Sequence, residues 1–311
     1  MDDWLLSLVP WGTEAIVWVQ ALSAPWLDKL AVGLTWLGYE QFYLVLLPCF
    51  YWCVNRDIGI NLAVISLLSA WTNSSLKHIV GIPRPSDPRL RVPLPETSPS
   101  FPSGHAQNAV ANWGYLAFRF RDKLFTVLAI VLIVGIGLSR IVLGVHFPQD
   151  VAAGWLAGIL LLLVYIWLSP RLGPWVGGQA TGVKAVMAVV VPVGLIFLHP
   201  ASMQGLYPAE GAITPMSAMT GLGIGLIMER AWVRFSVDGS WWQRILRLLL
   251  GLVIAGVLYA GPKLILPEGL SHGTESMLRF LRYSFLGWAV AFLCPWLFVQ
   301  LRLARVEEAT S

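Results

Sequence analysis

Charged residues are scarce in this chain. Asp, Glu, Lys and Arg make up only 12% of the 311 residues, whereas 57% are hydrophobic. Soluble domains carry about 25% charged residues, so the composition excludes an ordinary soluble protein and indicates an integral membrane protein whose neighbours are membrane lipids. The net charge of +4 comes without a basic stripe that carries interleaved aromatic residues, and we therefore expect no nucleic-acid partner.

Cysteines are few as well. Only Cys49, Cys53 and Cys294 are present, and each falls within an apolar run. Buried thiols are expected at such positions, and a disulfide framework is not. The N-terminal region also lacks the basic stretch of a signal peptide, because Asp2 and Asp3 follow Met1.

Long apolar runs dominate the rest of the chain. Runs bounded by charges and suited to crossing a bilayer occupy residues 40–54, 57–79, 104–119, 124–143, 149–168, 184–199, 213–229, 245–262 and 280–301. They predict an all-α fold, a polytopic membrane helix bundle of about nine transmembrane helices. The segment from Pro25 to Gly38 has leucines on one side at helical spacing, with Asp28 and Lys29 off that stripe, which predicts an N-terminal helix lying in the membrane interface.

The placement of Lys and Arg predicts the orientation in the membrane. On one side of the predicted spans lie Arg56, Arg119, Arg121, Lys123, Arg171, Lys184, Arg230, Arg234, Arg244, Arg247, Arg302 and Arg305, which are twelve of the 21 basic residues. The other nine include Lys77, Arg84 and Arg140, which belong to the anion site described next, so six remain against twelve. Because Lys and Arg gather in cytoplasmic loops, we expect the C-terminus in the cytoplasm and the anion site on the extracytoplasmic side.

Three of the cations stand where they can hold a tetrahedral anion. Lys77, Arg84 and Arg140 can surround a phosphate, the arginines by their fork of donors and the lysine as a compact charge. The hydroxyl of Ser103 and the amides of the Ser103–Gly104 turn can donate further hydrogen bonds, since glycine lets the backbone come close. These residues predict a phosphate-binding site.

Two histidines accompany this site. One imidazole can attack phosphorus while the other protonates the departing oxygen. Asp150 lies four residues after His146, with Pro148 between them suited to opening a helix, so the carboxylate can reach one imidazole nitrogen. We therefore expect His146 to be the nucleophile and His105 the general acid. Only one carboxylate accompanies the histidines, so we predict a mechanism that needs neither a metal nor another cofactor.

These residues form three motifs whose order and internal spacing resemble those of the type 2 phosphatidic acid phosphatases. The motifs are Lys77-x6-Arg84-Pro85, Pro102-Ser103-Gly104-His105 and Ser139-Arg140-x5-His146-x3-Asp150. The resemblance implies a helical fold and metal-independent hydrolysis of phosphomonoesters or diphosphates through a phosphohistidine, with the roles given above. The composition favours the membrane branch over the soluble haloperoxidase relatives. We predict a phosphatase core with the interfacial helix and five spans in residues 1–170, and about four appended transmembrane helices in residues 171–311.

The motifs specify the phosphoryl group and leave the rest of the substrate open. A site at the membrane face favours a lipid phosphate or diphosphate. Nine spans with extra helices after the core also resemble glucose-6-phosphatase and the sphingosine-phosphate phosphatases, so a sugar phosphate is an alternative substrate. Phosphotransfer to a hydroxyl is an alternative to hydrolysis, and a non-catalytic lipid-binding or transport role is a more distant one. The sequence gives no indication of the oligomeric state.

Overall fold

The structure of the protein is a computed structural model that describes residues 2–200, 209–265 and 270–307. The regular elements in these residues are helices, and none is a β-strand, which confirms the all-α prediction. The described part of residues 1–44 and 68–169 forms one compact unit, called the first unit below. The described part of residues 45–67 and 170–311 forms the second unit. The predicted functional division at residue 170 stays a prediction.

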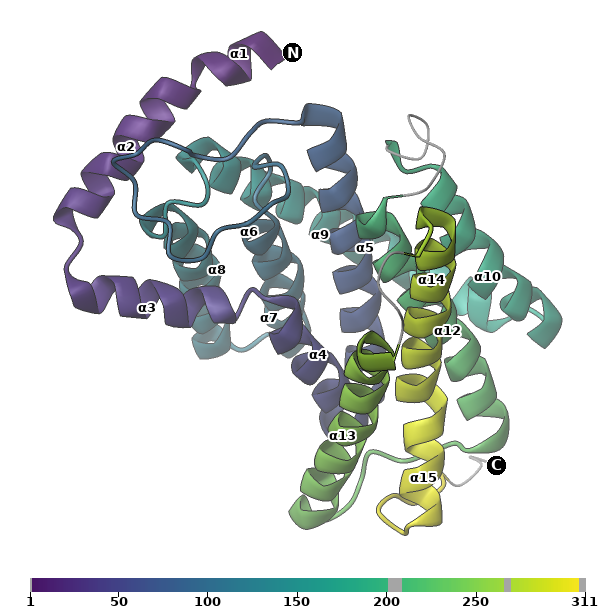
Figure 1. The fold of residues 1–311 in the computed structure, drawn as a ribbon. Coiled ribbons are helices and arrows are strands. Elements are labelled where there is room, and N and C mark those ends of the chain that lie inside the picture. The colour runs from purple at the N-terminus through teal and green to yellow at the C-terminus, as the bar shows by residue number, and fades with distance from the viewer. Residues whose placement is uncertain (1, 201–208, 266–269, 308–311) are drawn as a thin grey trace. The chain divides into compact units, whose positions relative to one another are not determined.

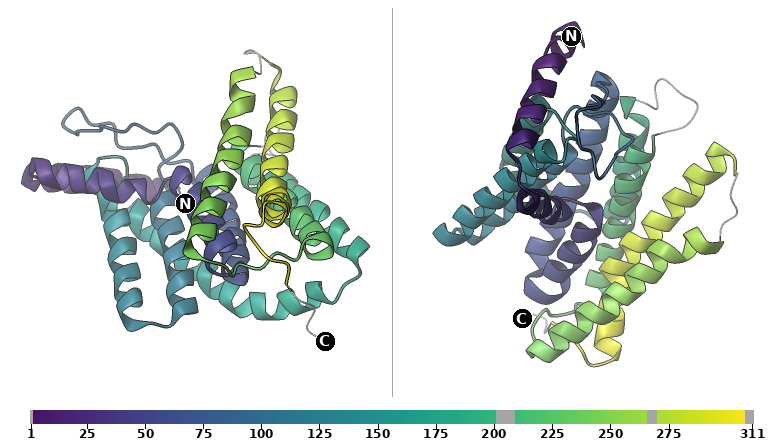
Figure 2. Two further views of the ribbon diagram at one scale, coloured as in Figure 1. Left: turned by 90° about the horizontal axis from the view of Figure 1, so that it is seen from below. Right: turned by 60° about the vertical axis from the view of Figure 1, so that its left-hand side comes forward.

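The first unit contains the N-terminal helices and all three motifs. Its helices are α1 (Asp2–Ser7), α2 (Val9–Leu22), α3 (Pro25–Trp36), the start of α4 (Glu40–Cys49), the end of α5 (Arg56–Val80), α6 (Gly104–Ala109), α7 (Tyr115–Phe120), α8 (Lys123–Val142) and most of α9 (Pro148–Gly177), with the π-helical turn η2 (Val110–Gly114) between α6 and α7. Both α2 and α3 contact α8 (Figure 1). The N-terminal helices cross α8 rather than running alongside it (Figure 2).

The second unit is a bundle in which α12 lies between α10 and α14 (Figure 1). Its helices are α10 (Thr181–Phe197), α12 (Glu210–Trp232), α13 (Trp241–Ile265), α14 (His272–Trp288) and α15 (Cys294–Gln300), with the π-helical turns η1 (Phe50–Val54) and η3 (Ala289–Leu293). Glycines set the distance between α12 and α14. A Cβ on Gly221 would lie 1.8 Å from the carbonyl oxygen of Ser284, so the two backbones can touch only because this side chain is absent.

Six described helices are long and apolar enough to cross a membrane, namely Trp4–Leu22, Lys123–Val142, Pro148–Gly177, Glu210–Trp232, Trp241–Gly261 and His272–Gln300. Pro25–Trp36 and Glu40–Val54, bent by 51°, would give a seventh if they formed one crossing. The predicted count of nine is therefore not confirmed. The segment Trp4–Leu22 was absent from the predicted spans, whereas α5, α6 to α7 and the 17-residue α10 lie in predicted spans and are not among the six.

Polar residues account for the lower hydropathy of α5, and they hold α6 in place. The Ser69 hydroxyl donates to Asn108 Oδ1 at 2.6 Å, and the Asn73 amide donates to Gln107 Oε1 at 3.0 Å. The Gln107 amide donates in turn to the Ser69 carbonyl at 3.0 Å. Each of these groups would cost about 1–3 kcal/mol if it were buried without a partner. The network therefore fixes α6, whose second residue is His105.

Candidate active site

His146 lies in the short connection between α8 and α9, and its side chain is 1% exposed. Because α9 begins at Pro148, Asp150 stands in the first turn, where unpaired backbone N–H groups favour a carboxylate. Asp150 Oδ2 accepts a hydrogen bond from the Phe147 N–H at 2.9 Å and lies 3.3 Å from His146 Nδ1. The other ring nitrogen, Nε2, is 3.2 Å from Nη1 of Arg84. With its proton on Nδ1, the neutral ring presents the Nε2 lone pair toward the arginine.

The surroundings of His146 keep the ring neutral. Burial lowers the pKa of His146 well below its ordinary value, and the charges of Arg84, Arg140 and Lys77 lower the pKa further. Burial also lowers the pKa of Arg84, but a guanidinium starts from so high a value that it stays charged. Burial lowers the pKa of Lys77 to about 7, so its charge depends on pH. The site therefore combines an unprotonated imidazole with two permanently charged guanidinium groups, which suits attack on an anionic group.

Ser100 was not among the predicted site residues, yet its hydroxyl completes the environment of this pair. The Ser100 hydroxyl is fully buried, donates to Asp150 Oδ2 and lies 3.3 Å from His146 Nδ1. The carboxylate oxygen is thus held by a hydroxyl, a backbone amide and an imidazole at once. Such partners fix the position of the carboxylate and so the orientation of the ring.

His105 is the second residue of α6 and faces the link between α3 and α4. Its ring meets the ring of Tyr39 edge-on, with centroids 4.7 Å apart. The guanidinium carbon of Arg140 lies 6.0 Å from the centroid of the same tyrosine ring. His105 Nε2 is buried and has no hydrogen-bond partner within the described residues. A buried imidazole nitrogen in this state is available to a bound ligand.

The three predicted cations converge on the loop between α5 and α6. Lys77 is 8% exposed and donates to the Pro99 carbonyl, and Arg84 Nε donates to the Ser98 carbonyl at 2.7 Å. Arg140 is fully buried and donates to the Thr35 hydroxyl on α3. The structure therefore brings the three cations from α5, the loop and α8 together.

One acidic side chain of this loop, Glu96, joins two of these cations. Its Oε2 lies 2.6 Å from Nη2 of Arg84, and its Oε1 is paired with Nη2 of Arg140. Glu96 was not among the predicted site residues. No periodic pattern marks loop residues, so neither Glu96 nor Ser100 carried a local signal beyond its closeness to the Pro102 motif.

The turn at Ser103 and Gly104 is positioned by α9 and α5. The Ser103 N–H donates to the Asp150 carbonyl at 2.9 Å, so this amide is already occupied and cannot be the anion donor that the sequence suggested. The Ser103 hydroxyl is buried without a partner in the described part of the chain, and it remains available. A Cβ on Gly154 of α9 would lie 2.5 Å from the Ser103 carbonyl oxygen, and one on Gly104 would lie 2.8 Å from Asn73 Oδ1. Both glycines are needed for this close approach.

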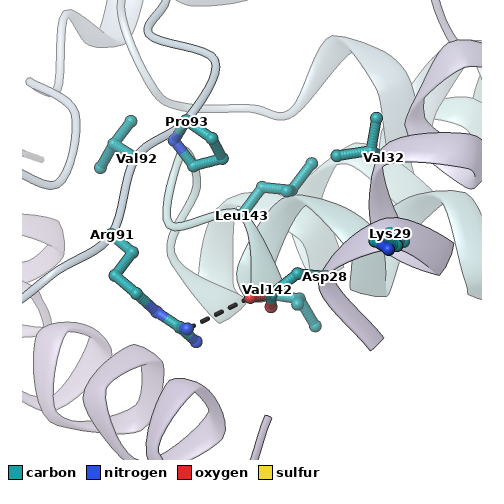
Figure 3. Close-up of a pocket in the computed structure, with 8 residues that line it drawn as sticks. All are labelled: Asp28, Lys29, Val32, Arg91, Val92, Pro93, Val142 and Leu143. Carbon is teal, nitrogen blue, oxygen red and sulfur yellow. Dashed lines mark ion pairs between the residues drawn. The ribbon is translucent and has the colours of Figure 1, made fainter. Parts of the chain in front are cut away.

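A cavity of about 540 Å³ opens beside α3 in the same unit. It is lined by Asp28, Lys29, Val32, Arg91, Val92, Pro93, Val142 and Leu143. Figure 3 shows Arg91 reaching from the loop to Asp28, with 3.1 Å between the paired atoms. The remaining wall is mostly aliphatic, so the cavity can accept apolar groups next to a charged rim.

As for metals, no group of three or more His, Cys, Asp or Glu side chains within residues 2–200, 209–265 and 270–307 is arranged to hold an ion.

Six described helices of membrane length and apolar composition indicate an integral, multi-pass membrane protein, and a histidine–carboxylate pair beside three cations is the arrangement expected of a metal-independent phosphatase. The chain belongs to the PAP2 superfamily. Residues 58–174 match the PAP2 superfamily, and residues 213–306 match the PAP2 superfamily phosphatase transmembrane extension. The resemblance to the type 2 phosphatidic acid phosphatases is thereby confirmed, and the protein is an enzyme of the phosphatase type.

Relatives extend over both parts of the chain. Phosphatidylglycerophosphatase B of Bacillus subtilis is 31% identical over 157 residues, which cover 46% of this chain and 75% of that protein. Lipid phosphate phosphatase delta of Arabidopsis thaliana is 22% identical over 379 aligned positions, which cover 97% of this chain and 90% of that protein. Human sphingosine-1-phosphate phosphatase 2 is 28% identical over 200 residues, which cover 61% of this chain and 49% of that protein. The crystal structure of a transmembrane PAP2-type phosphatidylglycerolphosphate phosphatase from Bacillus subtilis is 27% identical, with a TM-score of 0.46 over 54% of this chain and 87% of that one.

Proposed function

We propose that the protein hydrolyses a lipid phosphomonoester or diphosphate at the extracytoplasmic face of the membrane, by a metal-independent mechanism through a phosphohistidine. One observation carries the mechanism. His146 has Nδ1 turned to the Asp150 carboxylate and Nε2 turned to Arg84, so its lone pair points to the place where a phosphoryl group meets the cations. The extracytoplasmic face rests on the distribution of Lys and Arg.

Substrate binding uses the cations and the turn of the second motif. Lys77, Arg84 and Arg140 neutralise the phosphoryl oxygens, and the two arginines can each offer a pair of donors. The free hydroxyl of Ser103 and the amide at the start of α6, from Gly104, add donors without charge. These groups hold the phosphorus in front of Nε2.

The first chemical step transfers the phosphoryl group to the enzyme. The Nε2 lone pair of His146 forms the bond to phosphorus while the bond from phosphorus to the leaving oxygen breaks. His105, which is in its protonated imidazolium form when the substrate is bound, gives a proton to that oxygen and becomes neutral, and the Asp150 carboxylate stabilises the positive charge that develops on the phosphorylated ring.

The second step returns the enzyme to its starting state. His105 is neutral after the first step. Water attacks phosphorus and gives a proton to His105. The bond between phosphorus and Nε2 breaks with its electron pair returning to nitrogen. Orthophosphate leaves, and each group has regained its proton and charge.

Two kinds of observation support a lipid substrate. The relatives are named for phosphatidylglycerophosphate, lipid phosphate and sphingosine 1-phosphate. The site is built in a membrane protein beside α3, which exposes Trp26, Leu30 and Trp36 as an interfacial helix does. A lipid can leave its tail among the helices while its phosphate reaches the cations.

The direct test is release of orthophosphate by purified protein in detergent. We expect release from at least one of phosphatidate, phosphatidylglycerol phosphate, sphingosine 1-phosphate and an isoprenyl diphosphate, at a kcat/KM well above that for glucose 6-phosphate. The His146→Ala variant is the matched control for a contaminating phosphatase. Preference for the sugar phosphate would move the assignment to a sugar-phosphate phosphatase, and transfer to an added alcohol in place of water would show a phosphotransferase.

A further inference from the structure

Glu96 occupies the position between two arginines where the substrate phosphoryl group should bind. Each carboxylate oxygen is paired with a different guanidinium, Oε2 with Arg84 and Oε1 with Arg140. Two oxygens on one atom that bridge two guanidinium groups reproduce the bonding of a phosphate or phosphonate. Arg140 has no exposed surface and Arg84 only 12%, so an anion has little room to reach both arginines while Glu96 stays.

The residues after Glu96 bind Arg84 and Lys77 through their backbone. Carbonyl oxygens of Ser98, Pro99 and Ser100 accept from Arg84 or Lys77. The segment from Glu96 to Ser100 therefore contacts all three cations, Lys77, Arg84 and Arg140, at positions that a bound phosphate would otherwise occupy.

The earlier part of the same loop is fastened elsewhere. The Gln20 side chain of α2 accepts from the Arg91 N–H and donates to the Arg91 carbonyl, both at 2.9 Å. Arg89 pairs with Asp87 and with Glu14 of α2. These contacts hold residues 87–91 to α2 whether or not Glu96 is in place, so only the short segment after them has to move.

Charge explains why the contact can be given up. Without Glu96, the guanidinium groups of Arg84 and Arg140 face a single carboxylate, Asp150, and Lys77, whose pKa burial lowers to about 7, adds a further positive charge when it is protonated. Glu96 reduces the positive excess by one charge, and a dianionic phosphoryl group in its place reduces it by two. Orthophosphate, once formed, meets the same carboxylate as a competitor.

We propose that Glu96 is a positioning residue of the reaction: it holds Arg84 and Arg140 in phosphate-binding geometry between turnovers, yields to the substrate, and returns to displace orthophosphate. The inference rests on the proposed function of this site. Glu96 acts through the arginines and not on the reacting atoms, so removing its charge should tighten binding and slow release. Because the Glu96 carboxylate must leave the arginines before any anion binds, it lowers the affinity of every anion by the same factor. If Glu96 holds the arginines for about nine-tenths of the time, that factor is about tenfold.

The test compares Glu96→Gln with Asp87→Asn, which removes a carboxylate of the same loop that pairs with Arg89 outside the site. Calorimetry would measure the binding of orthophosphate, vanadate and dimethyl phosphate to each purified variant. We expect Glu96→Gln to bind all three about tenfold more tightly, by a similar factor for the singly and doubly charged anions. Asp87→Asn should leave each affinity unchanged. In turnover, Glu96→Gln should lower KM and kcat together and increase inhibition by orthophosphate.

Glu96→Asp keeps the charge and guards against a folding defect in Glu96→Gln, where Arg140 loses a buried partner. Its shorter side chain cannot span both arginines, so we expect an intermediate gain in affinity. Unchanged or weaker binding of the anions by folded Glu96→Gln and Glu96→Asp would overturn the proposal. Binding is measured without turnover, so failure of wild-type protein to hydrolyse any phosphate would count against the proposed function alone.

Discussion

Replacing Asp150 by asparagine tests how much the carboxylate charge contributes to the attack by His146. The substitution keeps the shape of the side chain, and its oxygen can remain at the Oδ2 position, where it still accepts from the Phe147 N–H and the Ser100 hydroxyl. Geometry is thus retained while the charge is lost. At the observed 3.3 Å, two unit charges attract by about 5 kcal/mol at an effective dielectric constant of about 20.

Only part of a unit charge develops on the ring in the transition state, so about half of that energy, 2–3 kcal/mol, is at stake. This corresponds to a loss of about 30- to 150-fold in rate. The assay is rapid-quench measurement of phosphoenzyme formation in a single turnover, with Asp87→Asn as a control for loss of a carboxylate in the same unit. A rate for Asp150→Asn within about threefold of wild type would refute the electrostatic role, because it would leave less than 1 kcal/mol for the charge.

Three further predictions concern the metal, the pH and the topology. Activity should persist in excess EDTA and be inhibited by vanadate, because cations of the chain hold the anion; loss of activity that magnesium restores would contradict this. Since burial lowers the pKa of His146 below its ordinary value of about 6.5, protonation of this nucleophile should lower kcat/KM only below that pH, whereas loss of the proton from the general acid His105 sets a separate fall on the alkaline side. The free energy of unfolding should also fall below the ordinary value, because the unfolded chain takes up the proton first; an acid limb above the ordinary value would contradict the burial. A cysteine placed in the 86–100 loop should react with an impermeant maleimide on intact cells and one near Arg121 should not, and the reverse pattern would move the site to the cytoplasm.

The motif spacing predicted much of the site because its residues stand at helix ends. Asp150 follows His146 by four residues across the start of α9, and this local geometry alone brings the carboxylate to the ring. Lys77 and Arg140 close the last turns of α5 and α8. Chain distance therefore carried real information about which of these residues lie close together, whereas their role in binding an anion stays a prediction.

The loop between α5 and α6 could not be predicted in the same way. Its path depends on contacts with α2 that lie about 70 residues away in the chain, such as those between Gln20 and Arg91. Glu96 and Ser100 reach the site only through that path. The sequence also missed the occupied amide of Ser103, since its acceptor is a carbonyl on α9.

The membrane spans show what apolar runs leave open. α5 was read as a span from its apolar residues, yet its Ser69 and Asn73 belong to a buried polar network with α6. Trp4–Leu22 was not among the predicted spans, although α1 and α2 together are long and apolar enough to cross a membrane. Helical character was predictable from composition, whereas the number of crossings depends on which polar residues find partners.

The most direct test of the account is to trap the phosphoenzyme and compare His146→Ala with His105→Ala. With His146→Ala the attacking nitrogen is gone, so we expect neither a phosphoenzyme nor turnover of any substrate. With His105→Ala a lipid phosphate should react about 10²- to 10⁴-fold more slowly, because its leaving oxygen needs a proton. Para-nitrophenyl phosphate should largely escape that loss, since its phenolate leaves without help. Rescue by para-nitrophenyl phosphate in His146→Ala, or a base-stable, acid-labile phosphoenzyme that survives that substitution, would contradict His146 as the nucleophile.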